Sequence, residues 1–181
     1  MHISKLNKYY FIDNFNPIHL KDLDKKITLI WRSKNGKNDI QKIYKLANFC
    51  KKKKIKLYLS NNVKLALKLR LNGAYISAYN REFSFNSYSF RKNFSLIGSA
   101  HNLFEAKIKK LQKVKIIFIS PIFKYKNKMP LGIYKSRIFF GDSSYEKIAL
   151  GGVDKKNINL LNMTKFIGFA GINYFKKKGP K

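Results

Sequence analysis

Three short pieces of sequence, LIGSAHN (96–102), FISPIF (118–123) and IALGGV (148–153), decide the fold of this chain. Each is a run of β-branched or aromatic apolar residues that ends in small or polar residues. Strands that are buried on both faces read as continuous apolar runs of this kind. In a TIM barrel, the chemistry lies at the carboxyl ends of such strands. The small polar residues that end each run are therefore candidate site residues.

Working outward from these pieces, further apolar runs extend the pattern to eight strands that alternate with helical periodicity. The expected strands are residues 9–12, 27–33, 55–60, 73–77, 94–100, 114–119, 146–150 and 165–171. The expected helices are residues 18–25, 39–54, 63–71, 102–112, 133–140 and a short one at 157–161. This alternation predicts a single α/β domain with a parallel sheet over residues 1–175. We expect residues 176–181 to form a basic disordered tail.

Length and composition exclude several classes of protein. The 181 residues are 45% hydrophobic, which is enough for a substantial core. No run approaches the roughly 18 apolar residues of a membrane helix, and the first residues lack a signal-peptide pattern, so we expect no membrane partner. The single cysteine, Cys50, excludes an internal disulfide and a cysteine-cluster metal site, so we expect a cytoplasmic protein.

The formal net charge of +30 is the most unusual property of the composition. Such a charge could indicate a nucleic-acid or anionic-membrane partner. However, Lys, Asn, Ile, Phe and Tyr are all over-represented, and their codons are all rich in A and T. The charge is also spread along the chain as Lys, whereas nucleic-acid-binding surfaces concentrate it and often use Arg. We therefore expect no nucleic-acid partner, with a dedicated polyanion surface as the alternative.

The strand ends carry motifs in a distinctive order. S-A-H (99–101) ends the fifth strand, S-P-I-F (120–123) and then L-G (131–132) follow the sixth, and G-G-V (151–153) follows the seventh. This order resembles thiamine phosphate synthase and its relative the thiazole tautomerase, a superfamily of small (β/α)8 barrels. The corresponding family motifs are S-A-H, then G-P-I-F-x-T-x-T-K with L-G, and then G-G-I. The resemblance implies a (β/α)8 TIM barrel with a truncated C-terminal helix, and phosphorylated pyrimidine and thiazole substrates.

The resemblance also implies substrate-binding residues. Arg32 and Lys34 match the Arg and Lys that hold the pyrophosphate of the pyrimidine substrate, while Ile30 replaces a Gln. Taken alone, the two cations would be read as solvated residues at a strand end. Asn127 stands where a threonine holds the thiazole phosphate, and Lys128 matches the family lysine. The other predicted substrate-binding residues are Ser60, Ser99 and the phosphate-loop glycines Gly151 and Gly152.

The expected metal site is altered. The family binds Mg²⁺ through two aspartates, and this chain carries Asn61 and Asn80 at those positions. Magnesium prefers carboxylate and phosphate oxygens, whereas an amide offers only a neutral carbonyl oxygen. We therefore expect weakened Mg²⁺ binding and no other cofactor.

Three functions remain open from the sequence. The first is the synthase reaction, which joins hydroxymethylpyrimidine pyrophosphate to thiazole phosphate and releases pyrophosphate. The second is a thiazole tautomerase in which His101 moves a proton, since imidazole titrates near neutrality; the alternative is that His101 caps or packs the following helix. The third is a non-catalytic barrel that binds phosphorylated ligands or RNA. Phe169, Tyr174 or a second subunit would have to cover the wall that lacks an eighth helix, so a homo-oligomer is also open.

Overall fold

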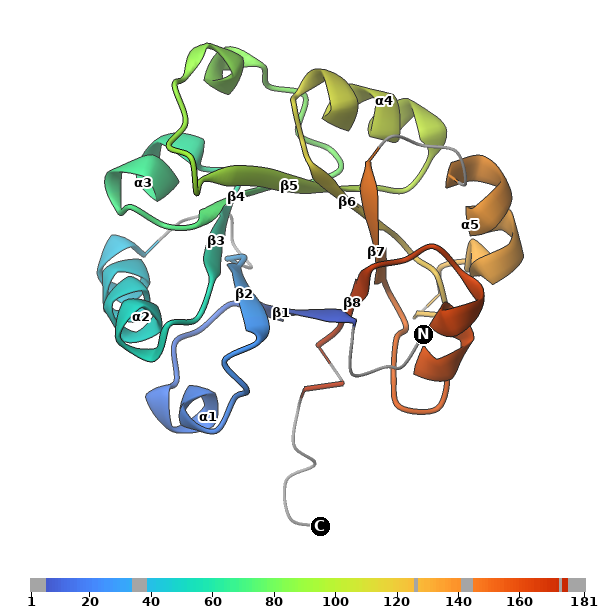
Figure 1. Cartoon of the computed structure of the whole chain (residues 1–181), viewed down its shortest axis with the longest axis horizontal. Helices are drawn as coiled ribbons and strands as arrows, with labels where there is room; N and C mark the ends of the chain where they lie inside the picture. Colours follow the sequence, from blue (N-terminus) through green and yellow to red (C-terminus); the bar gives the residue numbers. More distant parts are fainter. Residues whose placement is uncertain (1–5, 34–38, 126, 141–144, 173, 176–181) are drawn as a thin grey trace.

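Eight parallel strands form a closed barrel in the order of the sequence in the computed structural model of this chain (Figure 1). The structure describes residues 6–33, 39–125, 127–140, 145–172 and 174–175. Each strand pairs with the next, and β8 pairs with β1 to close the barrel. This confirms the expected (β/α)8 fold. The strands are β1 (Asn7–Ile12), β2 (Ile27–Trp31), β3 (Leu57–Ser60), β4 (Gly73–Ile76), β5 (Ser95–Ala100), β6 (Ile116–Ile119), β7 (Glu146–Leu150) and β8 (Gly168–Ala170).

Helices surround the barrel on the outside (Figure 1). Four of them begin at an Asn or Asp whose side chain accepts hydrogen bonds from the first helical N–H groups, which explains where they start. Within the described residues, every helix is too short or too polar to cross a lipid bilayer. The helices are α1 (Pro17–Lys21), α2 (Ile40–Lys53), α3 (Val63–Lys68), α4 (Leu103–Leu111) and α5 (Gly132–Phe140), with 3-10 helices η2 (Ser84–Ser87) and η3 (Ile158–Met163).

Some elements end earlier than the sequence pattern predicts. The α1 helix ends at Lys21, and the chain then turns at Asp24, whose carboxylate accepts a hydrogen bond from the Lys26 N–H at 2.9 Å. The α3 helix ends at Lys68, and Arg70 adopts a left-handed φ of 52° that closes the helix. The apolar periodicity of the sequence continues past both points, so it predicts helices that are longer than those in the structure.

Aromatic side chains fill the barrel interior. The Phe118 ring packs edge-to-face against Tyr9, Phe11 and Tyr75, with ring centres 4.9, 6.1 and 5.6 Å apart. Edge-to-face pairs are a favourable aromatic geometry. The interior is thus a packed core, as in other TIM barrels. Its other buried members are Ile30, Tyr58, Ile97, Ile148 and Ala170.

A second apolar layer lies between the strands and the helices. Trp31 belongs to this outer layer whereas Ile30 belongs to the interior, as strand alternation predicts. Because the next residue, Arg32, again falls on the inner side, β2 directs its guanidinium to the barrel mouth, over the ring of Phe11.

Aromatic residues cover the wall where an eighth helix was missing from the sequence pattern. The ring of Phe169, fully buried in β8, lies 4.7 Å from Tyr174 and 6.0 Å from Phe175. Phe175 also packs on Tyr10 of β1 at 5.1 Å. Among the described residues no α-helix follows β8, and these rings take its place on the barrel wall. The expected tail, residues 176–181, lies outside the described residues.

Candidate functional site

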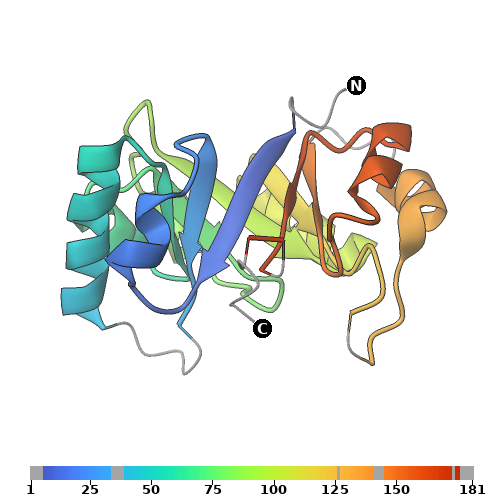
Figure 2. The ribbon, with the colours of Figure 1, turned by 90° about the horizontal axis from the view of Figure 1, so that it is seen from below.

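The predicted substrate-binding residues lie at one rim of the barrel. In Figure 2, β1 (dark blue) runs from the upper side of the picture to the lower side. All strands are parallel, so all their C-terminal ends lie on the lower side. Arg32 follows β2, Asn61 follows β3, Ser99 is near the end of β5 and Gly151 follows β7. The fold therefore gathers residues that are far apart in sequence at the face where TIM barrels carry their sites.

Arg32, Phe11, Tyr75 and Ser99 form a contiguous group at this rim. The Arg32 guanidinium lies 5.0 Å from the centre of the Phe11 ring, in a cation–π geometry. The Phe11 ring centre is 5.1 Å from that of Tyr75, and Ser99 is close enough to the Tyr75 hydroxyl to affect its pKa. Tyr75 and Ser99 are buried while Arg32 is exposed, so the group runs from the interior to the solvent. Of this group, the exposed Arg32 guanidinium is the part that can meet a bound anion.

The phenol of Tyr75 stays neutral at physiological pH. Burial raises the pKa of Tyr75 to about 12, although the Ser99 hydroxyl and the charge of Arg32 both lower it. A neutral hydroxyl can donate or accept a hydrogen bond. Sequence reasoning missed this residue because a tyrosine in an apolar strand reads as ordinary core, and its partner across the β4–β5 pair is the apolar Ile97.

Asn61 ties the end of β3 to the end of β4. Its Oδ1 accepts hydrogen bonds from the backbone N–H and the hydroxyl of Ser77, both at 2.9 Å, and its Nδ2 donates to the Tyr79 hydroxyl at 2.9 Å. Its backbone φ of 54° is left-handed, a conformation that Asn tolerates better than most residues. The amide oxygen therefore accepts two hydrogen bonds from Ser77, and the amide nitrogen donates one to Tyr79.

Gly151 and Gly152 let the end of β7 approach the loop after β6. Both have positive φ, +86° and +69°. A Cβ at Gly152 would lie 2.7 Å from the Phe123 carbonyl oxygen, and one at Gly151 would lie 2.9 Å from the Pro121 Cα. Close contact between two loops thus requires both glycines. Their phosphate-binding role stays a prediction.

The remaining predicted substrate-binding residues are less constrained. Asn127 and Lys128 are exposed in a turn in which the Lys128 N–H donates to the Tyr125 carbonyl at 3.2 Å. Ser60 is partly exposed at the end of β3. Lys34 lies outside the described residues, so its placement beside Arg32 stays a prediction.

His101 pairs with Glu105 at the start of α4. Glu105 Oε2 lies 3.0 Å from His101 Nδ1 and also accepts the His101 backbone N–H at 2.6 Å. His101 therefore makes the helix-start contact that the sequence left as an alternative. The pairing engages Nδ1, and the side chain is 42% exposed, so a ligand could reach the other ring nitrogen, Nε2.

Comparison with known proteins places this barrel in a family. The family model described as thiamine monophosphate synthase matches residues 20–175. The chain belongs to the thiamine monophosphate synthase family. A search of curated proteins found no match.

Solved structures show the same fold. Thiamine phosphate pyrophosphorylase from Pyrococcus furiosus aligns with a TM-score of 0.73 and 16% identity, over 93% of this chain and 86% of that one. A structure described as native KDPGal aligns with a TM-score of 0.70 and 12% identity, over 98% and 87% of the two chains. The HpcH/HpaI aldolase from Desulfitobacterium hafniense DCB-2 aligns with a TM-score of 0.66 and 11% identity, over 92% and 86%. At these identities the matches show the barrel alone.

The residues of this thiamine monophosphate synthase family member do not fit a Mg²⁺ ion held by Asn61 and Asn80. Asn61 Oδ1 is taken by Ser77, and Asn80 Oδ1 accepts the Glu82 N–H at 2.9 Å. Both oxygens are neutral amide oxygens, whereas Mg²⁺ favours carboxylates and demands near-octahedral geometry. Among the described residues, no cluster of three or more His, Cys, Asp or Glu could hold a metal either.

A buried lysine holds the loop that carries Asn80. The Nζ of Lys109, in α4, donates to the Asn80 carbonyl at 2.6 Å and to Gln112 Oε1 at 2.8 Å. Burial lowers the pKa of Lys109 to about 8, a shift that Glu105 opposes. Sequence reasoning missed this lysine, although it lies three positions after the buried Ala106 on the inward stripe of α4. A cation therefore fastens the loop to α4 in this member of the family.

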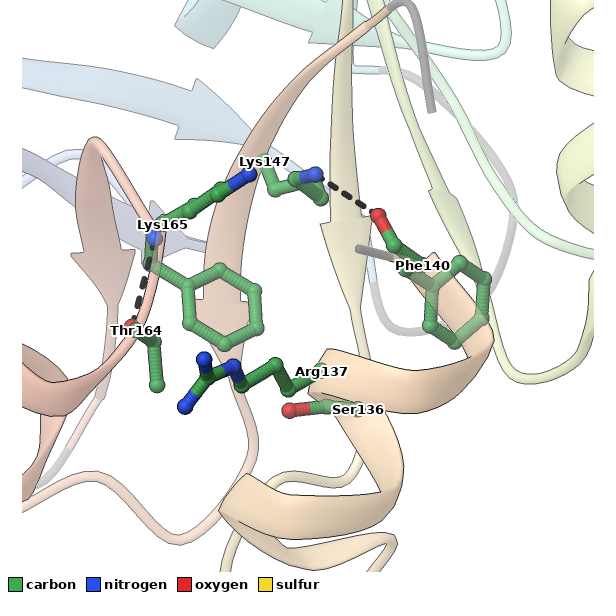
Figure 3. Close-up of a pocket in the computed structure, with 7 residues that line it drawn as sticks. Ser136, Arg137, Phe140, Lys147, Thr164 and Lys165 are labelled. Carbon is green, nitrogen blue, oxygen red and sulfur yellow. Dashed lines mark hydrogen bonds between the residues drawn. The ribbon is translucent and has the colours of Figure 1, made fainter. Parts of the chain in front are cut away.

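A small hollow between α5 and the segment before β8 is not a substrate site. Figure 3 shows Ser136 and Arg137 of α5 on one side and Thr164 and Lys165 on the other. Its volume of about 20 Å³ is enough for about one water molecule. Lys147, which lines it, donates from Nζ to the Phe140 carbonyl at 2.7 Å.

Proposed function

We propose that this protein is a transferase that joins hydroxymethylpyrimidine pyrophosphate to a thiazole phosphate with release of pyrophosphate. The observation that carries the proposal is the group formed by Arg32, Tyr75 and Ser99 at the barrel mouth. Arg32 matches the family residue that holds pyrophosphate, and Ser99 matches the serine that contacts the pyrimidine. The packing of Arg32 on Phe11, and of Phe11 on Tyr75 in the strand beside β5, supports the proposal.

The proposed reaction needs stabilisation of a departing polyanion. The bond from the pyrimidine methylene carbon to the pyrophosphate oxygen breaks with its electron pair on the oxygen, and the thiazole nitrogen then attacks the resulting pyrimidine cation. Preorganised positive charge at the leaving group is usually the largest single catalytic contribution. Arg32 is held by the Phe11 ring for this role, with Lys34 and Lys128 as the further cations of the motif.

The reaction is expected to depend only weakly on Mg²⁺. The amides of Asn61 and Asn80 are engaged by protein donors, so the cations of the mouth carry most of the charge neutralisation. Formation of thiamine phosphate from both substrates should be detectable by chromatography and should fall little when a chelator removes divalent ions. Absence of product at saturating substrates and metal would reject the transferase and favour a non-catalytic phosphate-binding or RNA-binding barrel.

A second candidate is the tautomerase reaction on a thiazole carboxylate phosphate, which the His101–Glu105 pair favours. A carboxylate that holds one imidazole nitrogen fixes the ring and leaves the other nitrogen for proton transfer. In this case His101→Ala should slow tautomerisation about 100-fold or more, because general acid–base groups typically contribute that much. Lys107→Ala, an exposed change on the same helix, is the matched control. Equal tautomerisation by His101→Ala and the control would eliminate this candidate.

A further inference from the structure

A hollow of about 410 Å³ lies at the opposite end of the barrel from the candidate site. Its lining residues come from the N-terminal ends of β3, β4, β5 and β6 and from the segments just before them. In Figure 2 this end of the barrel is the upper one, where the strands begin, and the candidate site lies at the lower end, where they finish. The lining residues are Lys56, Tyr58, Asn72, Lys92, Asn93, Phe94, Ser95 and Lys115.

Three exposed lysines line this hollow, and no carboxylate does. Lys56, Lys92 and Lys115 precede β3, β5 and β6, and no Asp or Glu is among the lining residues. Within the described part of the chain, their ammonium groups make no hydrogen bond and no ion pair. Lysine is common throughout this protein, so their number alone decides nothing. Their placement around one hollow is informative, because three positive charges that repel one another are stabilised when an anion binds between them.

The floor of the hollow is polar and rigidly built. The Tyr58 hydroxyl lies 2.9 Å from the Ser95 hydroxyl. Asn72 Oδ1 accepts a hydrogen bond from the Leu57 N–H at 2.9 Å, so the NH₂ group of Asn72 can donate a hydrogen bond to a ligand. The Tyr58 ring fits only because residue 73 is glycine: a Cβ there would lie 2.5 Å from Tyr58 Cε1.

The geometry points to a second binding site, in which this hollow takes a small polyphosphate anion between Lys56, Lys92 and Lys115. Lysine binds phosphate as a point charge, and hydroxyl and amide N–H donors on the floor supply the directional hydrogen bonds. The volume lies within the range of small-molecule sites, about 300–1,000 Å³. The inference is independent of the proposed transferase, whose site lies at the other end of the barrel.

Inorganic pyrophosphate is the probe for this site, with binding followed by calorimetry in about 0.15 M salt. The measurement uses Arg32→Gln protein, so that the mouth of the barrel contributes little. One pyrophosphate site should remain in this protein. The triple change Lys56→Gln, Lys92→Gln and Lys115→Gln should weaken the affinity of that site about tenfold or more, because hydrogen bonds to charged groups are stronger than those between neutral groups. The control triple Lys45→Gln, Lys107→Gln and Lys135→Gln removes the same charge from exposed helix positions and should leave the affinity within about twofold.

Tyr58→Phe separates a built site from general attraction to a basic protein. It removes the hydroxyl from the floor without changing charge, and it should weaken pyrophosphate binding several-fold. Equal weakening in the two lysine triples, or no binding to Arg32→Gln protein, would overturn the proposal. Single-stranded RNA that binds through the same lysines and is not displaced by pyrophosphate would overturn it in favour of a nucleic-acid surface.

Discussion

Arg32→Gln is expected to lower kcat/KM for the coupling reaction by about 100-fold or more, because removing one preorganised group that stabilises transition-state charge typically costs this much. The guanidinium lies over the Phe11 ring at 5.0 Å and next to the Tyr75–Ser99 pair, at the position predicted to hold pyrophosphate. Glutamine keeps a polar side chain but has no charge to offset the leaving group. Steady-state kinetics with each substrate varied in turn would measure the loss.

Two further variants make the Arg32 result specific. Lys45→Gln removes one positive charge from an exposed position on α2 and should leave kcat/KM within about twofold, since solvent screens distant charges. Arg32→Lys keeps the charge but loses the planar fork, so its kcat/KM should lie between those of the wild type and Arg32→Gln. Unchanged kcat/KM in Arg32→Gln would remove Arg32 from the mechanism.

Phe118→Ala is expected to reduce the free energy of unfolding by about 3–5 kcal/mol, the usual cost of truncating a buried Phe. Phe118 is fully buried in β6 and touches the rings of Tyr9, Phe11 and Tyr75 across the barrel interior. The surrounding strands form a closed ring, so the walls can collapse little into the space left behind. Urea denaturation followed by circular dichroism would measure the change.

The matched control for Phe118 is Tyr134→Ala on α5, where the aromatic ring is 77% exposed. Its truncation should change the free energy of unfolding by no more than about 0.5 kcal/mol. A loss below about 1 kcal/mol in Phe118→Ala would contradict a tightly packed interior.

The strand order could be read from the sequence because parallel strands buried on both faces leave a strong local signal. The β7 strand has the predicted bounds, Glu146–Leu150, and the motif pieces at 96–102, 118–123 and 148–153 lie at strand ends as expected. The ends of α1 and α3 were wrong by a few residues, since side-chain turns and left-handed residues stop a helix that apolar periodicity would continue.

The candidate site was only partly readable. Arg32 and Ser99 could be found from their matched motif positions, but Tyr75 and Lys109 could not, because each looks ordinary in its own element. Tyr75 matters through its proximity to Ser99, and Lys109 through its contacts with Asn80 and Gln112. These are contacts between elements, and no local pattern encodes them.

The barrel fold, the rim that carries the predicted residues and the loss of both family carboxylates could be read from the sequence, because apolar strand runs and motif residues are local features that can be matched to a family. Other features depend on the tertiary structure. Arg32 packs on Phe11 near Tyr75, and Asn61 forms hydrogen bonds with Ser77 and Tyr79. At the other end of the barrel, a hollow is lined by Lys56, Lys92 and Lys115. The physical reason is that side-chain contacts depend on how separate strands close around one core.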